Sequence, residues 1–159
     1  MKFKTETSAG GIVFKQIKSS KSKVKSYVWL ITQHSQHKDW GFPKGLIGDK
    51  DKNEPMEQAA LREVEEEGGV KAKIVNNQPI KVQYKYRWKD TLVSKTVYYF
   101  LMEYISGDPK NHDWEVQEAR FVSEEEAKKT LTHSSDKEAF EQALKVFYNK
   151  ASSAVVVQR

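Results

Sequence analysis

Apolar positions follow two different spacings along this chain. Over most of its length they alternate with polar residues or form short runs rich in valine, isoleucine and aromatic residues, which is typical of β-strands. A turn at Lys89-Asp90 separates two of these segments, whereas the stretch from Trp40 to Gly45 breaks the pattern. The predicted strands cover residues 6–15, 27–32, 72–88, 95–105 and 116–122.

The second spacing belongs to a helix. Between residues 54 and 68 the composition changes to alanine, leucine, glutamate, glutamine and arginine, which are all strong helix formers. Ala60, Leu61 and Val64 fall on one stripe of such a helix. The glycine pair Gly68-Gly69 is expected to end it.

Two further helices are predicted in the last third of the chain. Ser123 precedes three glutamates, as an N-cap residue does, and a longer helix is expected over residues 136–150. Strands and helices that mix in this order predict one α/β domain over residues 1–150 with a mixed sheet. Residues 151–159 are predicted to be a disordered tail.

Composition limits the partners. The 159 residues include 27 Lys and Arg against 22 Asp and Glu, a net charge of +5, which favours anionic partners such as phosphorylated metabolites without demanding nucleic acid. The basic stretch from Lys18 to Lys25 is accordingly interpreted as a solvated loop. There is no cysteine, so a metal would need oxygen or imidazole ligands. No signal peptide or membrane span is visible, and a cytoplasmic protein is expected.

The candidate chemistry is concentrated on the first predicted helix. Glu63, Glu66 and Glu67 share one helical face because they are three and four residues apart. Like charges at this spacing repel, and carboxylate oxygens are the ligands that Mg²⁺ and Mn²⁺ prefer. Arg62 is placed to pair with Glu66 at i+4. Without further context, a solvated acidic helix face explains the same cluster.

The context is a family motif. The chain resembles the Nudix hydrolases, whose signature is glycine, five residues, glutamate, seven residues, and then Arg-Glu-aliphatic-any-Glu-Glu-any-Gly-aliphatic. Residues 62–70 (REVEEEGGV) fit the second half, and Glu54 and Gly48 lie at the required spacings. Members of the family also commonly place the motif glycine directly after Phe-Pro-Lys, which here points to Gly45. The segment from Leu46 to Asn53 is therefore interpreted as lengthened by three residues, with Gly45 as the structural equivalent.

The resemblance implies a fold and a set of roles. The fold is an α/β/α sandwich with a mixed β-sheet between helices, and the cofactor is Mg²⁺, for which Mn²⁺ is a possible substitute. The general base is either a glutamate of the helix or Glu115, two alternatives that the sequence leaves open. The implied metal ligands are Gly45, Glu63, Glu66 and Glu67, and the implied catalytic residues are Arg62, Glu63, Glu66, Glu67 and Glu115.

Substrate residues are predicted from one strand and a second resemblance. Strand alternation places Val82, Tyr84, Tyr86 and Trp88 on one face, which suits either base stacking or an ordinary core. Outside the signature, the chain is similar to the bacterial dinucleoside tetraphosphate hydrolases in several segments: 8–14, 40–45, 95–99, 114–116 and 136–138. This likeness implies that diadenosine tetraphosphate is hydrolysed to ATP and AMP. It also implies adenine stacking by Tyr84 or Tyr86 and phosphate contacts by Lys95 and Tyr99, and Lys44 is a further phosphate candidate.

Several alternatives stay open. Other Nudix activities would act on a modified nucleoside triphosphate, a nucleotide sugar or the 5′ end of RNA, and a domain that only binds nucleotides or RNA is also conceivable. The protein is expected to be a monomer or a homodimer. The four histidines show no metal-ligand spacing and are interpreted as ordinary polar residues, with His34 and His37 close enough to the Trp40 segment to touch a substrate.

Overall fold

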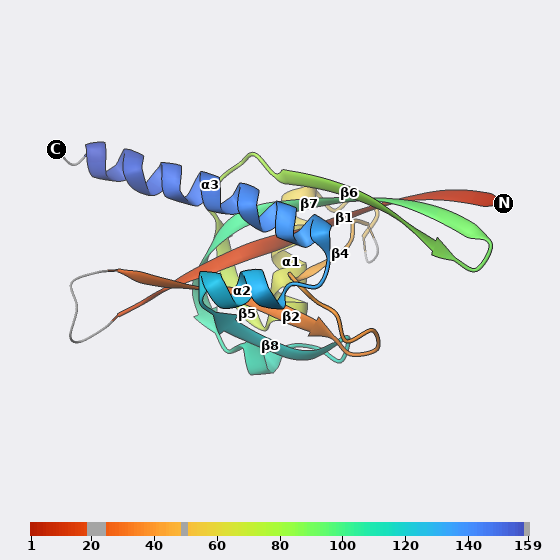
Figure 1. The fold of residues 1–159 in the computed structure, drawn as a ribbon, viewed down its shortest axis with the longest axis horizontal. Coiled ribbons are helices and arrows are strands. Elements are labelled where there is room, and N and C mark those ends of the chain that lie inside the picture. Colours follow the sequence, from red (N-terminus) through yellow and green to blue (C-terminus); the bar gives the residue numbers. More distant parts are fainter. Residues whose placement is uncertain (19–24, 49–50, 158–159) are drawn as a thin grey trace.

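A computed structural model describes residues 1–18, 25–48 and 51–157, with side chains up to residue 150. Figure 1 shows a strand-rich chain in which α1 lies between two groups of strands and α2 and α3 follow the last strand. Strands β1 to β4 are Lys2–Ile17, Ser26–His34, Trp40–Gly41 and Lys44–Leu46, and β5 to β8 are Val70–Ile74, Ile80–Trp88, Thr91–Gly107 and Val116–Val122. The helices are α1 (Met56–Gly68), α2 (Glu124–Thr130) and α3 (Ser134–Val157), with a short 3₁₀ turn, η1, at Pro109–Asn111.

The sheet is mixed and is built around its two longest strands. β1 and β7 run parallel over 13 paired positions, from Lys2 opposite Thr91 to Phe14 opposite Glu103. All other strand pairs are antiparallel: β2 and β4 pair with β1, β5 and β6 pair with β7, and β3 and β8 pair with β2. The predicted mixed sheet is therefore confirmed.

Helices cover both faces of this sheet, because alternate residues of each central strand point to opposite sides. Ile12 and Trp29 belong to the apolar cluster that also contains residues of α2 and α3. Their neighbours Val13 and Leu30 belong to a second cluster with Val64 of α1. The expected α/β/α sandwich is thus the observed arrangement, with α1 on one side and α2 and α3 on the other.

Helix α1 follows the sequence prediction closely. It starts after Pro55 and ends at Gly68, and Gly69 caps it in the left-handed conformation with its N–H on the Glu65 carbonyl. Ala60 and Val64 are fully buried against the sheet. The opposite faces of the same helix stay free to carry charge.

Two strand predictions need correction. The segment predicted as one strand over residues 72–88 is two strands, β5 and β6, with a break at residues 75–79 that contains Pro79. The segment from Trp40 to Gly45, predicted to be irregular, contains β3 and β4, which exist because β2 and β1 supply their hydrogen bonds. Both errors come from pairing between distant segments, which a local pattern does not report.

The ends of the elements differ from the prediction for the same reason. β1 starts at Lys2, four residues earlier than predicted, because its first residues pair with the start of β7. The N-cap prediction for Ser123 is confirmed, since its Oγ accepts the Glu126 N–H at 3.1 Å. Helix α3 starts at Ser134 and continues to Val157, past the predicted end at residue 150.

Some predictions are not tested by this structure. Most of the basic stretch from Lys18 to Lys25 lies outside the described residues. The division into one domain over residues 1–150 and a tail over residues 151–159 stays a prediction. Within the part of the chain that is described, no helix combines the length and the apolar character needed to cross a bilayer.

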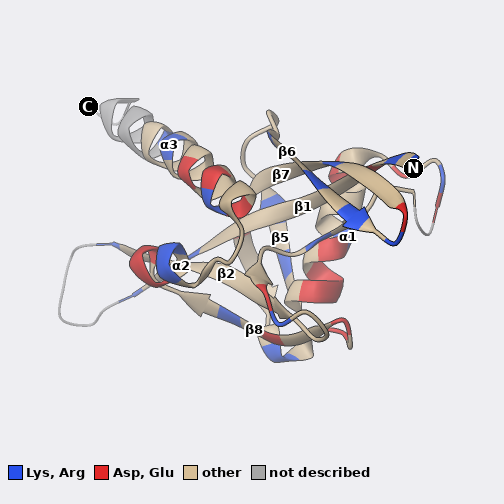
Figure 2. Cartoon of the chain, turned by 45° about the vertical axis from the view of Figure 1, so that its right-hand side comes forward, with Lys and Arg blue, Asp and Glu red and all other residues tan. Residues whose placement is uncertain are grey.

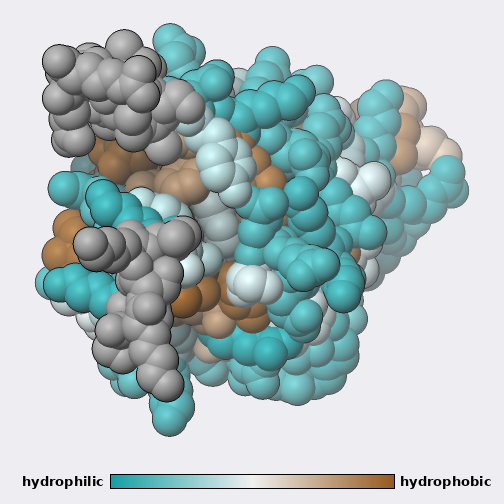
Figure 3. All heavy atoms as spheres, turned by 60° about the vertical axis from the view of Figure 1, so that its left-hand side comes forward, coloured by the Kyte–Doolittle hydropathy of each residue, from teal (hydrophilic) through white to brown (hydrophobic). Residues whose placement is uncertain are grey.

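The two ends of the molecule differ in character. At one end, the start of β1 and the β6–β7 hairpin extend away from the body (Figure 1). We call residues 1–6 and 81–95 the arm. The opposite end is shown in Figure 3, where apolar side chains lie among polar ones beside the segments that are not described. Figure 2 marks charged residues along the ribbon of the arm and of α1.

Candidate active site

The predicted glutamates line one cavity of about 320 Å³, which we call the acidic cavity. Glu63, Glu66 and Glu67 reach it from α1 through their spacing of three and four residues. Glu115 reaches it from the loop before β8. The full lining consists of Ser8, Lys44, Gly45, Leu46, Glu63, Glu66, Glu67, Lys95, Asp113, Trp114 and Glu115.

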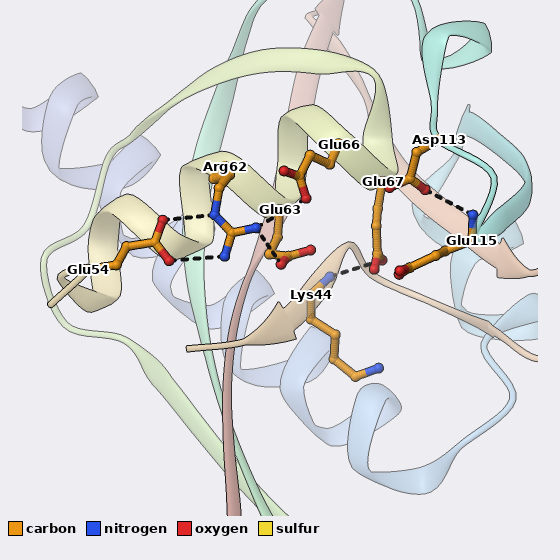
Figure 4. Close-up of polar contacts among 8 residues, drawn as sticks. All are labelled: Lys44, Glu54, Arg62, Glu63, Glu66, Glu67, Asp113 and Glu115. Atoms are coloured by element: carbon orange, nitrogen blue, oxygen red, sulfur yellow. Dashed lines mark hydrogen bonds and ion pairs between the residues drawn. The ribbon is translucent and has the colours of Figure 1, made fainter. Parts of the chain in front are cut away.

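The loop that carries Glu115 is tied to the end of α1. The Asp113 N–H donates to the Glu66 carbonyl at 2.8 Å, and Asp113 Oδ1 accepts the Glu115 N–H at 3.1 Å. These two bonds bring a residue nearly 50 positions away to the helix. Figure 4 shows the carboxylates of Glu67 and Glu115 pointing toward one another.

Arg62 binds several carboxylates from outside the cavity. Its guanidinium donates to both oxygens of Glu54, at 2.8 and 3.0 Å, and its Nη1 donates to Glu63 Oε1 at 2.8 Å and to Glu66 Oε2 at 3.1 Å (Figure 4). The predicted i+4 pair with Glu66 is confirmed. Arg62 is not among the residues that line the cavity, so it orients the acids from outside.

The structure distinguishes the two candidate glycines. Gly45 lies in β4, and a Cβ added to it would lie 2.2 Å from the Glu63 carboxylate carbon. Gly48 instead occupies a turn at φ +78°, and the nearest atom to its added Cβ would be 3.6 Å away, on Lys52. The glycine that packs against the glutamates is therefore Gly45, and its role at the metal stays a prediction.

Crowded carboxylates have perturbed acidities. Burial raises the pKa of Glu67 to about 8; Lys44 opposes this rise, and the neighbouring Glu63 and Glu115 add to it. Burial also raises the pKa of Glu63, and the Arg62 guanidinium only partly opposes it. A site that raises the pKa of two adjacent carboxyls favours a cation, because a positive charge restores the ionised form.

Two lysines stand where the acidic cavity opens. The Lys44 N–H donates to Glu67 Oε1 at 3.3 Å, while its side chain extends away from α1 (Figure 4). Burial opposes the charge on that side chain, but Asp136, Glu67 and other nearby negative groups raise the pKa of Lys44. Burial and the neighbouring charge of Lys44 lower the pKa of Lys95, whose Nζ lies 3.6 Å from Glu6.

A second depression continues from these lysines. This aromatic groove, of about 720 Å³, shares Lys44 and Lys95 with the acidic cavity. Tyr84 and Tyr86 line it with ring centroids 6.3 Å apart, on the strand face that alternation predicted. Its lining consists of Lys4, Glu6, His34, His37, Asp39, Lys44, Tyr84, Tyr86, Trp88, Thr91, Val93, Lys95 and His133.

Tyr99 is not brought to either surface. Its side chain is fully buried, and its hydroxyl donates to Asp136 Oδ1 at 2.8 Å. Asp136 in turn lies close enough to influence Lys44. The predicted phosphate contact of Tyr99 stays a prediction, and the observed bond gives the residue a supporting position beneath the lysine.

Several lining residues were not singled out from the sequence. Asp39 Oδ2 lies 2.6 Å from His133 Nε2, whereas Asp39 Oδ1 and Ser8 Oγ are buried and have no hydrogen-bond partner among the described residues. His133 had been interpreted as an ordinary polar residue. It reaches Asp39 from the loop before α3, 94 residues later in the chain, so no local spacing could have signalled the pair.

The donor set fits a hard divalent cation, although the side chains are not yet arranged around one. Among the described residues, no three acidic or imidazole side chains form a ready metal-binding group. Arg62 engages Glu63 and Glu66, and the Lys44 N–H engages Glu67. The cavity nevertheless collects carboxylate oxygens and the unpartnered Ser8 hydroxyl, which is the chemistry that Mg²⁺ and Mn²⁺ bind.

Comparison with known proteins places this site in a family. A family model of the NUDIX domain matches residues 12–143. Over 139 residues the chain is 30% identical to a protein of Mycobacterium tuberculosis (strain CDC 1551 / Oshkosh) that carries the name mutator protein MutT4, and the match takes in 87% of this chain and 54% of that protein. The chain thus spans about half the length of this curated relative.

Solved structures share the fold at low identity. The Ap4A hydrolase of C. elegans has a TM-score of 0.63 and 20% identity, covering 91% of this chain and 98% of that one. The NUDIX domain of Shewanella oneidensis NrtR, complexed with ADP ribose, has a TM-score of 0.62 and 19% identity, covering 90% and 88%. The family match includes α1 with its glutamates and most of the sheet. The chain therefore belongs to the NUDIX domain family.

Proposed function

We propose that this chain hydrolyses dinucleoside tetraphosphates, and diadenosine tetraphosphate in particular, to ATP and AMP in a metal-dependent reaction. The observation that carries the proposal is the continuity of the two depressions. The acidic cavity and the aromatic groove share Lys44 and Lys95. A phosphate chain would cross these two cations with its cleaved bond at the glutamates and one base in the groove.

In this proposal the metal is held by Glu63, Glu66 and Glu67, with the backbone of Gly45 close by. When bound, a divalent cation would supply positive charge that stabilises the phosphoryl transition state and favours an ionised water. Arg62 fixes the orientation of two of these carboxylates through its bonds to Glu63 and Glu66. Positioning of this kind is a large part of catalysis at phosphorus.

The general base is one of two neighbouring carboxylates. Glu67 and Glu115 both line the acidic cavity, and they are close enough that Glu115 raises the pKa of Glu67. Either one would accept the proton of the attacking water. The carboxylate that does not act as the base would lie beside the cation.

The cations and aromatic rings would bind the rest of the substrate. Lys44 and Lys95 would contact phosphate oxygens at the junction of the two depressions. Tyr84 or Tyr86 would stack on one adenine, since both rings line the groove. Tyr99 would support Lys44 through Asp136, because its hydroxyl is bonded to that carboxylate.

The names of the similar proteins point to different substrates. The structure of a C. elegans Ap4A hydrolase agrees with the proposal in name, whereas the mycobacterial relative is named for a mutator activity. A second candidate is therefore hydrolysis of a modified nucleoside triphosphate. The first candidate is favoured in this proposal because the lining of the groove continues from Lys44 and Lys95 to Trp88 at the end of β6, which would accommodate a second nucleoside.

The experiment is a product assay with Mg²⁺. Diadenosine tetraphosphate, an oxidised guanosine triphosphate, a nucleotide sugar and a 5′-triphosphorylated RNA are compared at equal concentration, and products are separated by anion-exchange chromatography. We expect equal amounts of ATP and AMP from diadenosine tetraphosphate, at the highest kcat/KM of the four. Comparable or faster turnover of another substrate would replace the assignment with that one.

A further inference from the structure

The excess positive charge of this chain is concentrated in the arm. Residues 1–6 and 81–95 contain seven Lys or Arg and two Asp or Glu, from chain totals of 27 and 22. The remainder therefore contains 20 of each and is neutral overall. The net charge of +5 belongs to a projection that extends from the body (Figures 1 and 2). A local field of this kind attracts polyanions.

One face of the arm carries a row of aromatic rings. Tyr84, Tyr86 and Trp88 occupy alternate positions of β6 and all line the aromatic groove. Exposure increases along this row: Tyr84 is half-buried, whereas Tyr86 is 36% and Trp88 is 62% exposed. At about 3.4 Å per residue, the row extends roughly 14 Å from the junction with the acidic cavity.

Lysines run beside the rings on the same face. Lys4 pairs with Val93 across β1 and β7, and both residues line the groove. Lys2 is paired with Thr91 two positions further out, and Lys89 Nζ lies 5.8 Å from the centre of the Trp88 ring. Cations thus accompany the aromatic row from Lys95 to the tip of the hairpin.

The acidic groups on this face are already engaged. Glu6 accepts the Tyr86 hydroxyl at 2.5 Å and lies 3.6 Å from both Lys4 and Lys95, so it fixes a ring and two lysines. Asp39 pairs with His133 at the inner end of the groove. At the tip, Asp90 Oδ1 accepts the Thr91 hydroxyl at 3.5 Å. The outer part of the face keeps its positive character.

We propose that this face of the arm binds a single-stranded polynucleotide. Rings that stack on successive bases, with cations that follow the phosphates, are the features by which proteins hold single strands without reading their sequence. A mononucleotide would occupy only the inner tyrosines. A protein partner would favour a contiguous apolar surface, whereas here the row of rings is flanked by Lys4 and Lys95.

This inference goes beyond the proposed function and does not depend on it. Binding would be measured with an oligonucleotide that ends in a 5′-hydroxyl and in buffer with EDTA, so neither a cleavable anhydride nor a metal is present. The probe is a fluorescein-labelled dodecamer of riboadenylate, followed by anisotropy. Failure of hydrolysis and failure of binding are then observed separately.

The decisive variants lie on opposite faces of the same arm. Trp88→Ala removes the outermost ring of the row and is expected to weaken binding about 10-fold, the loss typical of one stacked base. Phe3→Ala is the matched control, because Phe3 is 77% exposed but pairs with Leu92 on the other face. It should change the dissociation constant less than about twofold.

Further measurements separate the contribution of stacking from that of charge. Trp88→Tyr should restore most of the affinity lost in Trp88→Ala, and the DNA dodecamer should bind about as well as RNA, because stacking and phosphate contacts do not need the 2′-hydroxyl. Inorganic polyphosphate of equal charge should compete poorly. The proposal is overturned by absence of binding, by equal losses in the two alanine variants, by a strict preference for RNA, or by equal competition from polyphosphate.

Discussion

The acidic cavity and the aromatic groove are neighbours that form in different ways. Three of the four glutamates in the cavity come from five consecutive residues of α1, and Arg62, next to them in sequence, holds two of these glutamates. The groove assembles side chains from β1, β2, the β2–β3 connection, β4, β6, β7 and the loop before α3. The cavity is a local product of helical spacing, whereas the groove is a product of tertiary structure.

The difference in burial suggests different roles. Burial shifts the acidities of Glu63 and Glu67, so a small displacement in the cavity should change the chemical step. The outer groove is exposed, with Trp88 at 62%. Changes there should alter affinity and leave the chemical step intact. Variants of the cavity are therefore expected to act on kcat, and variants of the groove on KM.

The largest expected effect is on a cavity glutamate. Glu66→Gln keeps the size of the side chain but removes one negative charge from the proposed metal site. We expect kcat/KM for diadenosine tetraphosphate to fall on the order of 10³-fold. Glu65→Gln is the control, because Glu65 lies on the exposed side of the same helix and should leave the rate within about twofold. A rate for Glu66→Gln that matched the control would remove α1 from the chemistry.

The second largest effect is expected for Gly45→Ala, and it distinguishes the two candidate glycines. Gly45→Ala would place a methyl group on the Glu63 carboxylate, which Arg62 holds in position, so we expect kcat to fall about 100-fold. Gly48→Ala should leave kcat unchanged and lower the free energy of unfolding by about 1 kcal/mol, because its φ is +78°. Steady-state kinetics and thermal denaturation of both variants make this comparison. The reverse pattern would identify Gly48 as the glycine of the site.

A smaller loss of activity is expected when Arg62, which lies outside the lining of the cavity, is replaced. Arg62→Met removes the two bonds to Glu54 and the bonds that orient Glu63 and Glu66. Because Arg62 does not line the cavity, we expect a fall in kcat of about 30-fold, typical of residues that orient metal ligands, and a loss of stability of about 2 kcal/mol. The kinetics are measured well below the melting temperature. An unchanged kcat would mean that Arg62 has a purely structural role.

The smallest effect concerns the groove. Tyr84→Ala should raise KM for diadenosine tetraphosphate about 10-fold with little change in kcat, since one stacking partner is lost. Tyr84→Phe keeps the ring and should behave like the unmodified protein. If Tyr84→Ala lowered kcat as strongly as the cavity variants do, the proposed division between chemistry and affinity would be wrong.

The same contrast explains how much the sequence could predict. The C-terminal end of α1, the shared face of Glu63, Glu66 and Glu67, and the alternation of Tyr84 and Tyr86 follow from local sequence, and the structure agrees with each. Strands β3 and β4 and the early start of β1 depend on partners far along the chain. Local periodicity contains no information on those partners.

The site residues divide in the same way. Asp39 and His133 form a pair although they are 94 residues apart in the sequence, and neither residue belongs to a motif that predicts this contact. Resemblance predicts a direct phosphate contact for Tyr99, which stays a prediction, whereas the structure shows its buried hydroxyl bonded to Asp136. Resemblance transfers residue types between proteins, but burial depends on how each chain packs.

The most direct test of the account is a crystal structure with Mn²⁺ and a bound nucleotide, in which anomalous scattering identifies the metal. We predict a Mn²⁺ ion coordinated by carboxylates of Glu63, Glu66 and Glu67, with Arg62 still bound to Glu54. A nucleotide seated in the groove beside a cavity that holds no metal under these conditions would contradict the central claim that these glutamates form the metal site.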